Sequence, residues 1–585
     1  MLKLIRKMRR SDVLMALVCS VLVLGQIYFD LELPDYMSDL TVLIETPGST
    51  MSDILHTGLE MLGCTLASAA LCILCGYLTA KVAAGFALTT RERVFNKIAD
   101  FGQHEMMSFS VPSLINRTTN DITQVQMVIA MGLQLLIKSP IMAVWAVIKI
   151  IDKSWELSVI TAGFIVALLM VMVIVIALVV PRFRRVQKLT DKINLVAREN
   201  LTGINVVHAY NAEDYQNEKF EKSNSELMRT QLFNQRTFAF LTPVMQLGMN
   251  ALALVIYWVG ASLVNAVPAE DTAVKLETFS NIVVFGTYAT YVIMSIMMLV
   301  IIIMLLPAAQ VSAQRINEVL GSKTDIHEGT RSDSPETGTV EFRHVSFHYP
   351  DGGDVLEDIS FKANRGETVA FIGATGSGKT TLVSLIARFY DATEGEVLVD
   401  GVNVKDYTFD ALYDRVGYVT QKAVLFSGTV KSNVLFGKSR GGRDDADVGK
   451  ALDLAMASEF VDRLPQGMDS PIAQGGTNVS GGQKQRLSIA RALAREPEIL
   501  IFDDSFSALD YRTDAALRAG LKSELGSTTR LIVAQRIGTI RNADKIIVLD
   551  DGKAVGIGTH DELMQNCPVY QEIARSQLSS EELGA

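Results

Sequence analysis

The chain has little of what marks secreted, fibrous or nucleic-acid-binding proteins. Its 585 residues contain only five cysteines, an odd and small number that does not suit a disulfide scaffold. The charge balance, 54 Lys and Arg against 64 Asp and Glu, argues against a basic surface that coats nucleic acid. With 49% hydrophobic residues, fibrous and disordered chains are excluded as well. Four cysteines lie in apolar runs, where cysteine packs as a small hydrophobic residue: Cys19, Cys64, Cys72 and Cys75.

The first half of the chain is rich in apolar residues, and the second half is not. A single hydrophobic core stops growing near about 250–300 residues, so a chain of this length holds two or more domains. A helix that crosses a bilayer needs about 20 mostly apolar residues. We expect six such helices, which form an α-helical transmembrane domain over residues 1–320. They cover residues 12–29, 56–84, 125–151, 155–180, 238–266 and 278–306.

Positive charges set the expected orientation in the membrane. Five basic residues precede the first span, whereas the segment 30–53, predicted as a loop, carries six acidic residues and no Lys or Arg. Because Lys and Arg stay on the cytosolic side, the amino terminus lies inside. The connections 152–153 and 267–277 are short and lie outside. We therefore predict a multi-pass protein of the cell inner (plasma) membrane, with its amino terminus and its second half in the cytoplasm.

Two longer insertions between the spans, at about 85–124 and 181–237, keep a helical pattern of apolar residues. We predict that they extend the spans into paired helical stalks on the cytosolic side. The tip around 211–217 is polar and turn-prone, so it can dock on another domain. The alternative is a pair of solvated loops, but unstructured loops of this length are uncommon.

The second half of the chain begins after a polar segment at 321–339, which is rich in turn-forming residues and is predicted as a linker. Beyond it, over residues 340–585, short β-branched runs alternate with helical patterns. This alternation predicts an α/β domain with a mostly parallel sheet.

The strongest motif directly follows the apolar run ETVAFI. It has the pattern of a P-loop, in which glycines let backbone N–H groups turn toward phosphate oxygens and the next helix directs its positive end at the anion. Lys379 is expected to reach the β- and γ-phosphates, and Thr380 to bind magnesium. The residues of the loop and the helix start are Gly373, Ala374, Thr375, Gly376, Ser377, Gly378, Lys379, Thr380 and Thr381.

A second apolar strand, ILIFDD at 499–504, ends in two carboxylates. In open α/β sheets, ligands bind at the carboxyl ends of the strands. Asp503 is therefore expected to hold magnesium, directly or through water, and Asp504 to face an attacking water. Together the two motifs predict a site for ATP with Mg2+.

A third motif lies between these two and is followed by KQRLSIARAL. It places a serine and two glycines at a helix start, which makes a second phosphate-binding N-terminus. This motif resembles the signature of ATP-binding cassette (ABC) proteins, and the order of the three motifs matches that family. The motif consists of Val479, Ser480, Gly481, Gly482 and Gln483.

The resemblance covers essentially the whole chain, because six spans followed by one cassette are the layout of ABC exporter half-transporters. It implies an ABC-type transport ATPase that works as a dimer, in which the signature of each chain closes on ATP held by the other. It also implies that Tyr349 stacks on adenine, that Gln421 approaches magnesium and the attacking water, and that Asp510 communicates across the dimer. Without this match to the family's order of motifs, a Gln or Asp is ordinarily part of the surface.

Two positions depart from active cassettes, which usually carry glutamate after the magnesium aspartate and histidine in the switch segment. This chain has Asp504 and Gln535 there. The aspartate carboxylate lies on the order of 1.5 Å farther back, and glutamine cannot become cationic. The pair resembles the degenerate-site subunit of heterodimeric bacterial multidrug exporters, which implies a second half-transporter chain with the glutamate and the histidine. A homodimer with two weakened sites, or substitutions without meaning, are the alternatives.

The sequence says least about the substrate. Lys138 interrupts the third span, and a charge inside a membrane is by default functional, although an internal pair with a carboxylate or carbonyl explains it at least as well. Methionines give the sixth span an adaptable surface, which suits varied apolar compounds but also plain helix packing. The candidate substrate residues are Lys138, Gln246, Asn250, Asn281, Met294 and Met298.

The predicted function is the ATP-driven export of lipophilic or amphipathic compounds, with Mg2+ as cofactor. In this prediction the chain is half of a heterodimer in the lipid bilayer, takes a small-molecule substrate and binds no nucleic acid. The alternatives are an importer of a metal chelate with the same layout and a nonhydrolysing, ATP-sensing regulatory subunit.

Overall fold

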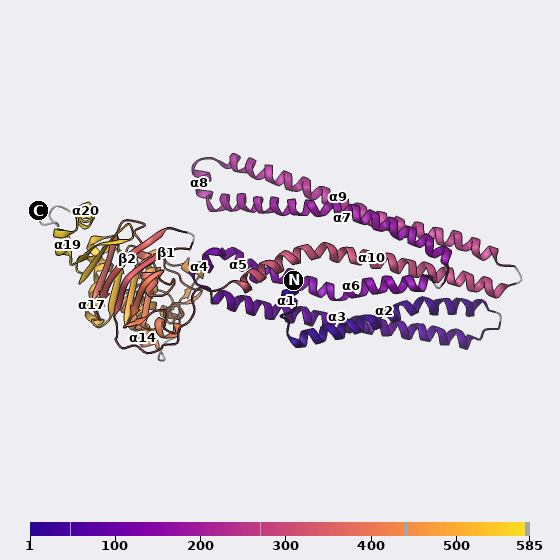
Figure 1. Ribbon diagram of the computed structural model, residues 1–585, viewed down its shortest axis with the longest axis horizontal. Coiled ribbons are helices and arrows are strands. Elements are labelled where there is room, and N and C mark those ends of the chain that lie inside the picture. Colours follow the sequence, from indigo (N-terminus) through magenta and orange to yellow (C-terminus); the bar gives the residue numbers. More distant parts are fainter. Residues whose placement is uncertain (47, 152, 269–270, 351, 438–442, 579–585) are drawn as a thin grey trace. The chain divides into compact units, whose positions relative to one another are not determined.

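The computed structural model describes residues 1–46, 48–151, 153–268, 271–350, 352–437 and 443–578 (Figure 1). Asp152 and residues 269–270 of the two short connections, and residues 579–585 of the second predicted domain, lie outside the described residues. The chain divides into two compact units. We call Met1–Ala99 with Val111–Ser322 the helical unit, and Asp100–Ser110 with Lys323–Ala585 the α/β unit.

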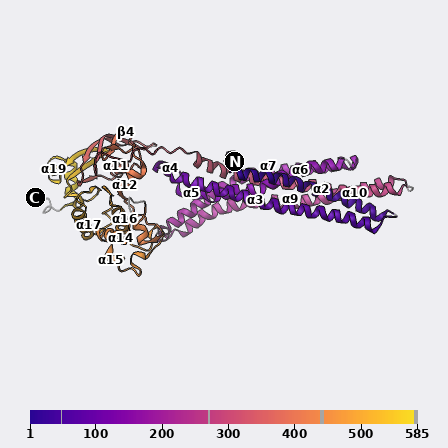
Figure 2. The same ribbon diagram turned by 90° about the horizontal axis from the view of Figure 1, so that it is seen from below.

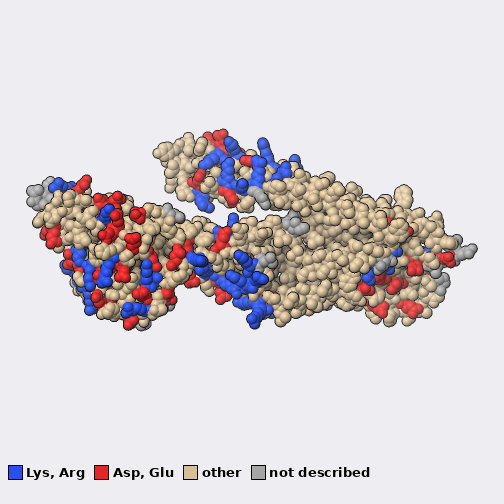
Figure 3. All heavy atoms as spheres, viewed as in Figure 1, with Lys and Arg blue, Asp and Glu red and all other residues tan. Residues whose placement is uncertain are grey.

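The helical unit consists of long helices, six of which are long and apolar enough to cross a membrane. On the face drawn in Figure 3, the middle of these helices carries almost no charged side chains, as lipid contact requires. The predicted six-span fold is confirmed. The helices are α1 Leu2–Ile5, α2 Arg10–Glu45, α3 Met51–Ala99, α5 Val111–Thr118, α6 Asn120–Ile151, α7 Trp155–Thr202, α8 Ile204–Ala209, α9 Glu213–Ala266 and α10 Thr272–Gly321.

The spans continue as helices well past the thickness of a bilayer. α7 and α9 comprise 48 and 54 residues, which correspond to about 70–80 Å at 1.5 Å per residue. They pack against each other, and the short helix α8 joins them (Figure 1). This pair has the stalk form predicted for 181–237. Its turn lies around α8 and Asn211, whose φ of 50° is left-handed.

Helix α2 runs through most of the acidic segment that we expected to be a loop, and it ends only at Glu45. Three of the acidic side chains there, Asp30, Glu32 and Asp35, are partly buried and paired with lysines of α6 and the connection that follows it. Pairing offsets the cost of placing charge among apolar helices, so the helix need not stop where the charges begin. The nitrogen–oxygen distances of this ion-pair cluster are 2.9 Å for Lys138–Asp30, 3.1 Å for Lys149–Glu32, 2.7 Å for Lys149–Asp35 and 3.3 Å for Lys153–Asp35.

The other predicted stalk, at 85–124, is interrupted. Helix α3 ends at Ala99, and the segment Asp100–Ser110 belongs to the α/β unit. This segment contains helix α4, Gln103–Ser108. Glu105 of α4 is only 4% exposed and accepts a hydrogen bond of 3.0 Å from the backbone N–H of Asp325. The chain returns to the helical unit with α5.

The α/β unit is built around a six-stranded sheet in the order β12-β11-β3-β10-β9-β6. Its strands are parallel except β12, so the mostly parallel sheet predicted from the alternation is confirmed. A second sheet, β2-β1-β4-β5, is antiparallel. The strands are β1 Val340–His348, β2 Asp354–Ala363, β3 Thr368–Gly373, β4 Glu394–Val399, β5 Val402–Asn403, β6 Val416–Val419, β7 Gly428–Thr429, β8 Pro471–Ile472, β9 Ile499–Asp503, β10 Thr529–Val533, β11 Lys545–Asp550 and β12 Lys553–Gly558.

The helices of the α/β unit form two groups. In Figure 2, α14, α15 and α16 gather on one side of the unit, and α11, α12 and strand β4 gather on the other. The helices after α4 are α11 Lys379–Ile386, α12 Phe409–Arg415, α13 Val430–Val434, α14 Asp445–Leu454, α15 Ser458–Val461, α16 Gly481–Leu493, α17 Tyr511–Glu524, α18 Ile537–Ile540, α19 His560–Asn566 and α20 Pro568–Gln577.

The parallel sheet is buried on both faces, which explains why its strands read as continuous apolar runs. In β9, Leu500 and Phe502 pack into one hydrophobic cluster, whereas Ile499 and Ile501 pack into the other. All four side chains are fully buried. The next residue, Asp503, therefore lies at the end of the strand, where the two hydrophobic clusters stop.

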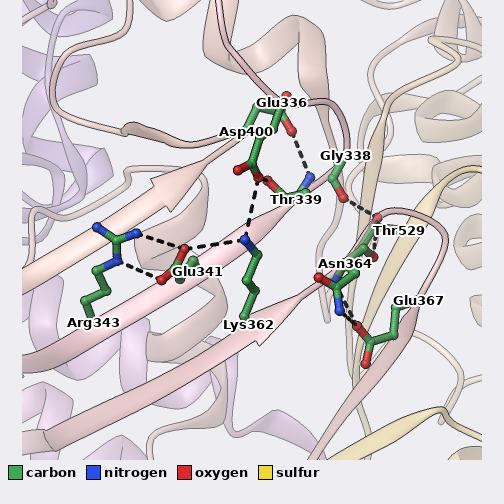
Figure 4. A network of polar contacts seen from close by, with 10 residues as sticks. All are labelled: Glu336, Gly338, Thr339, Glu341, Arg343, Lys362, Asn364, Glu367, Asp400 and Thr529. Carbon is green, nitrogen blue, oxygen red and sulfur yellow. Dashed lines mark hydrogen bonds and ion pairs between the residues drawn. The ribbon is translucent and has the colours of Figure 1, made fainter.

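The polar segment at 321–339, predicted as the linker, is held against the strands of the α/β unit. The N–H of Gly329 donates to the carbonyl of Tyr407 at 2.9 Å, and the N–H of Thr339 donates to Oδ1 of Asp400 at 2.8 Å. Figure 4 shows its last residues in a polar network, where Glu336 also faces Lys362. From Lys323 onward, this segment is part of the α/β unit.

Candidate active site

The loop between β3 and α11 has the backbone of a phosphate cradle. Gly373, Gly376 and Gly378 have φ values of 157°, 89° and 91°, which other residues rarely adopt. A Cβ on Gly373 would lie 2.0 Å from the carbonyl oxygen of Leu549, so only glycine fits. The loop leads into α11, whose first residue is Lys379. The sequence thus places a helix N-terminus and a lysine together, as anion binding requires.

Lys379 lies within this loop and is only 8% exposed. Its Nζ donates to the carbonyl oxygens of Gly373 and Ala374, at 2.9 and 2.6 Å. Burial lowers the pKa of Lys379, while the charges of Asp504 and Asp503 oppose that shift. A cation between the loop and two carboxylates is suited to bind phosphate with a metal ion.

Asp503 ends β9 and is 3% exposed. Its Oδ1 accepts a hydrogen bond of 2.8 Å from Oγ1 of Thr380, and its Oδ2 accepts one of 3.2 Å from the hydroxyl of Tyr418. Burial raises the pKa of Asp503, and these two hydrogen bonds act against the increase. We did not predict Tyr418, although it lies only three residues before Gln421, in strand β6.

Asp504 brings the two site glutamines together. Its Oδ2 accepts a hydrogen bond from Nε2 of Gln421 at 3.2 Å and another from Nε2 of Gln535 at 2.8 Å. Gln421 follows β6 and Gln535 follows β10, which lie on either side of β9. The three strand ends meet at one edge of the sheet, where ligands of such sheets bind.

These groups fit a magnesium ion that is bound together with a triphosphate. Mg2+ prefers oxygen ligands and is usually held by one or two protein groups, substrate phosphates and water. The hydroxyl of Thr380, the carboxylate of Asp503 and the side-chain oxygen of Gln421 are such groups. Across the described ranges, no cluster of three or more His, Cys, Asp and Glu side chains could hold a metal by itself. A magnesium ion bound here would share these groups with phosphate oxygens and water.

Tyr349 follows β1 and packs beside the start of α11. Its hydroxyl shares a hydrogen bond of 3.0 Å with Oγ1 of Thr381. Its ring meets the rings of Phe347 and Tyr390 edge to face, with centroid distances of 5.0 and 5.3 Å. The structure therefore brings this predicted residue next to the phosphate cradle.

The signature residues form the N-terminus of α16. Oγ of Ser480 accepts from the N–H of Gln483 at 3.3 Å, and Oε1 of Gln483 accepts from the N–H of Ser480 at 2.9 Å, a reciprocal capping box. Gly481 and Gly482 occupy the first turn, and Val479 packs against the core. Within the described part of the chain, no hydrogen bond or ion pair joins these residues to the group around Asp503.

Asp510 caps α17 in a similar way. Its carboxylate accepts from the N–H of Thr513 at 2.9 Å and from the Thr513 hydroxyl at 2.7 Å. These hydrogen bonds lower the pKa of Asp510. The structure places Asp510 on the surface, apart from the polar groups that surround Asp503.

Both halves of the chain match the profiles of one known family. The family profile of the ABC transporter transmembrane region matches residues 13–296, and the ABC transporter profile matches residues 356–507. An uncharacterised ABC transporter ATP-binding protein of Mycobacterium tuberculosis is 37% identical over 561 residues, which are 94% of each chain. The chain belongs to the ABC transporter family.

Two further proteins place this ABC transporter among its relatives. The ATP-dependent lipid A-core flippase of Aromatoleum aromaticum is 32% identical over 512 residues, 86% of this chain and 82% of the flippase. The solved structure of a bacterial Atm1-family ABC exporter with ATP bound is 22% identical. The two structures match over 97% of this chain and 100% of the exporter chain, with a TM-score of 0.80. The match confirms the fold class.

The ABC transporter carries one transmembrane region and one nucleotide-binding domain in a single chain. That layout defines a half-transporter, as predicted, and half-transporters of this family generally dimerise. The family also confirms the prediction of an ABC-type transport ATPase, whose nucleotide-binding domain binds ATP.

The structure does not gather the candidate substrate residues of the transporter into one group. Lys138 is engaged in the ion pair with Asp30. Gln246 and Asn250 are exposed on α9, whereas Asn281, Met294 and Met298 lie along α10. Their role in substrate binding stays a prediction.

Tyr418→Phe tests the support of the magnesium carboxylate. The change removes one hydrogen bond to Asp503 and keeps the ring. A net hydrogen bond contributes about 1 kcal/mol. The magnesium concentration for half-maximal ATP binding to this chain should therefore rise about fivefold. Because that bond lowers the pKa of Asp503, the effect should grow as the pH falls. Magnesium titration of labelling by a photoreactive ATP analogue measures it. Tyr413→Phe on α12 is the control, and an equal effect of both changes would remove Tyr418 from the site.

Proposed function

We propose that this ABC transporter exports lipophilic or amphipathic compounds as one half of a heterodimer, and that its own ATP site hydrolyses weakly. The observation that carries the proposal is the contact of both site glutamines with one oxygen of Asp504. An orienting base must offer a free carboxylate oxygen to the attacking water. Here two neutral amides occupy one carboxylate oxygen of Asp504, and the shorter side chain sets the other oxygen on the order of 1.5 Å farther back than in a glutamate.

In contrast to the weakened catalytic groups, the groups that bind the nucleotide are complete. We assign phosphate binding to the P-loop with Lys379, and magnesium binding to Thr380, Asp503 and Gln421. Magnesium, when bound, supplies positive charge that neutralises the phosphates. Tyr349 stacks on adenine. The chain thus binds ATP well, but Asp504 and Gln535 supply neither the reach of glutamate nor the positive charge of a protonated histidine.

The intact signature gives this chain a role in a second site. The capped N-terminus at Ser480 has two glycines in its first turn, and Ser480 and Gly481 are exposed. In the proposed heterodimer it closes on ATP held by a partner chain that carries the glutamate and the histidine. Asp510 communicates between the two cassettes.

The proposed domain limits are 1–320 for the transmembrane domain, 321–339 for the linker and 340–585 for the nucleotide-binding domain. We place the amino terminus and the nucleotide-binding domain in the cytoplasm, on the distribution of Lys and Arg. The flippase among the relatives acts on a lipid, as its name states, which supports an amphipathic substrate. Export follows from the layout that the chain shares with ABC exporters.

Co-purification tests the proposal. The tagged chain should bring down an untagged half-transporter, and the pair should take up a lipophilic dye into inverted vesicles only with hydrolysable ATP. The chain alone should bind Mg-ATP but hydrolyse it at least about tenfold more slowly than the pair. A homodimer with full activity would refute the heterodimer. Loss of the dye from inverted vesicles would show import, and passive flux gated by ATP would show a regulatory subunit.

A further inference from the structure

The residues 388–390, which follow α11 and its C-cap Ala387, form an unusual end to the P-loop helix. The N–H of Phe389 donates to the carbonyl of Ser384 at 2.9 Å, and the N–H of Arg388 donates to that of Leu385 at 3.1 Å. This is the pattern of a Schellman cap, in which glycine usually takes the left-handed position. Here Arg388 takes it, with φ of 52°. Its side chain is anchored at both sides, because Nη2 donates to the carbonyl of His327 at 2.7 Å and Nε donates to Oδ1 of Asp391 at 3.0 Å.

The two consecutive aromatic residues of this cap, Phe389 and Tyr390, contact different parts of the nucleotide site. The ring of Phe389 packs on Tyr418 with a centroid distance of 5.2 Å, and Tyr418 donates to the magnesium carboxylate of Asp503. The ring of Tyr390 packs edge to face on Tyr349 at 5.3 Å and 85°. Tyr418 on the magnesium side of the site and Tyr349 on the adenine side therefore both contact the segment 388–390.

Tyr390 also touches the segment that arrives from the transmembrane region. Its hydroxyl donates to Sδ of Met107 on α4 at 3.6 Å. The α4 segment is attached to the rest of the α/β unit, since the buried Glu105 accepts a hydrogen bond from the N–H of Asp325. Within the segment, the rings of Phe101 and Phe109 stack at 5.7 Å. The covalent chain then runs from α4 into α3 on one side and α5 on the other.

We propose that Tyr390 is a positioning residue: it fixes the ring of Tyr349 for adenine and reports the presence of the base to α4. The proposal rests on the proposed function, in which Tyr349 stacks on adenine. Without the Tyr390 ring, Tyr349 loses one of its two aromatic neighbours and can leave the stacking position. Without the Tyr390 hydroxyl, the stack remains but its contact with Met107 is lost.

A comparison of ATP with inorganic tripolyphosphate isolates the contribution of the base. In the assembled pair, each ligand competes with a photoreactive ATP analogue for labelling of this chain. Tyr390→Leu should weaken competition by ATP about tenfold and competition by tripolyphosphate less than about twofold, because aromatic stacking concerns only the base. Tyr390→Phe keeps the ring and should restore ATP binding. Tyr349→Leu is the positive control.

A thiol introduced by Ser108→Cys, in a Cys64→Ser and Cys72→Ser background, tests the link to α4. ATP should slow its reaction with a maleimide about threefold more than tripolyphosphate does. Tyr390→Phe should abolish that difference while ATP binding stays normal. An equal response to both ligands before the Phe change would overturn the link.

The other outcomes separate the inference from the proposed function. Equal weakening of ATP and tripolyphosphate by Tyr390→Leu would show general damage and overturn the positioning role. If Tyr349→Leu weakens ATP selectively but Tyr390→Leu does not, the adenine assignment stands and the inference is wrong. If neither change affects ATP, both the adenine assignment and the inference are wrong.

Discussion

Ser480→Ala combined with Gly482→Asp should reduce the ATPase activity of the assembled transporter at least about a hundredfold, or about 2.7 kcal/mol of barrier. The first change removes the hydroxyl that caps α16. The second places a carboxylate in the first turn, where it would face the phosphates of ATP on the partner chain. Like charges at that distance repel, so the closed dimer becomes unfavourable.

The fold should survive this double change, which makes the result interpretable. A Cβ at Gly482 would meet only the carbonyl oxygen of Ala508 at 3.4 Å, an ordinary contact. An aspartate in the first turn of a helix is favourable for the helix dipole. Labelled ATP should therefore still bind the P-loop of this chain. Gly449→Asp, where an added Cβ meets nothing within 4 Å, is the matched control. Turnover retained in the double variant would refute the cross-chain role.

Asp504→Glu together with Gln535→His should raise hydrolysis at this chain's own site at least about tenfold, or about 1.4 kcal/mol. Both glutamines now donate to the single oxygen Oδ2 of Asp504. The glutamate extends the carboxylate toward the attacking water, and the histidine adds a group that can become cationic. Each change alone should do less, because groups that act as a unit are strongly non-additive. Single-turnover hydrolysis by this chain, in a pair whose partner carries an inactivated site, measures the effect.

The complementary loss experiment uses the native pair. Asp504→Asn should lower total ATPase far less than removal of the corresponding glutamate from the partner. Equal losses from the two changes would contradict the division of labour and favour a symmetric pump. So would fast hydrolysis by the unmodified chain alone.

The parts of the site that could be predicted from the sequence are those that lie in short contiguous motifs. The P-loop and the end of β9 each carry their geometry locally, in glycines with positive φ and in an apolar strand that stops at a carboxylate. Tyr418 and Tyr390 could not be predicted in this way, because their partners are distant. Tyr418 contacts a residue 85 positions away, and Tyr390 contacts Met107, 283 positions away.

The length of α2 shows the same limit for the fold. Apolar content predicts a helix up to residue 29, and the acidic residues that follow it are typical of a loop in water. The helix continues through these acidic residues because lysines of α6, far along the chain, pair with three of them. Sequence patterns report what each segment prefers alone, whereas these charges are accommodated by segments that meet after folding.

The ion-pair cluster also constrains how the protein is made. Asp30 is synthesised 108 residues before Lys138, and Asp35 is synthesised 114 residues before Lys149. While the ribosome is still adding α3 and α6, the carboxyl-terminal half of α2 carries carboxylates without their lysines, and such charges are costly in hydrocarbon. The ion pairs of that half of α2 can form only after α6 has been made. The order of synthesis thus leaves the packing of the first long helix to be completed after the third predicted span has been made.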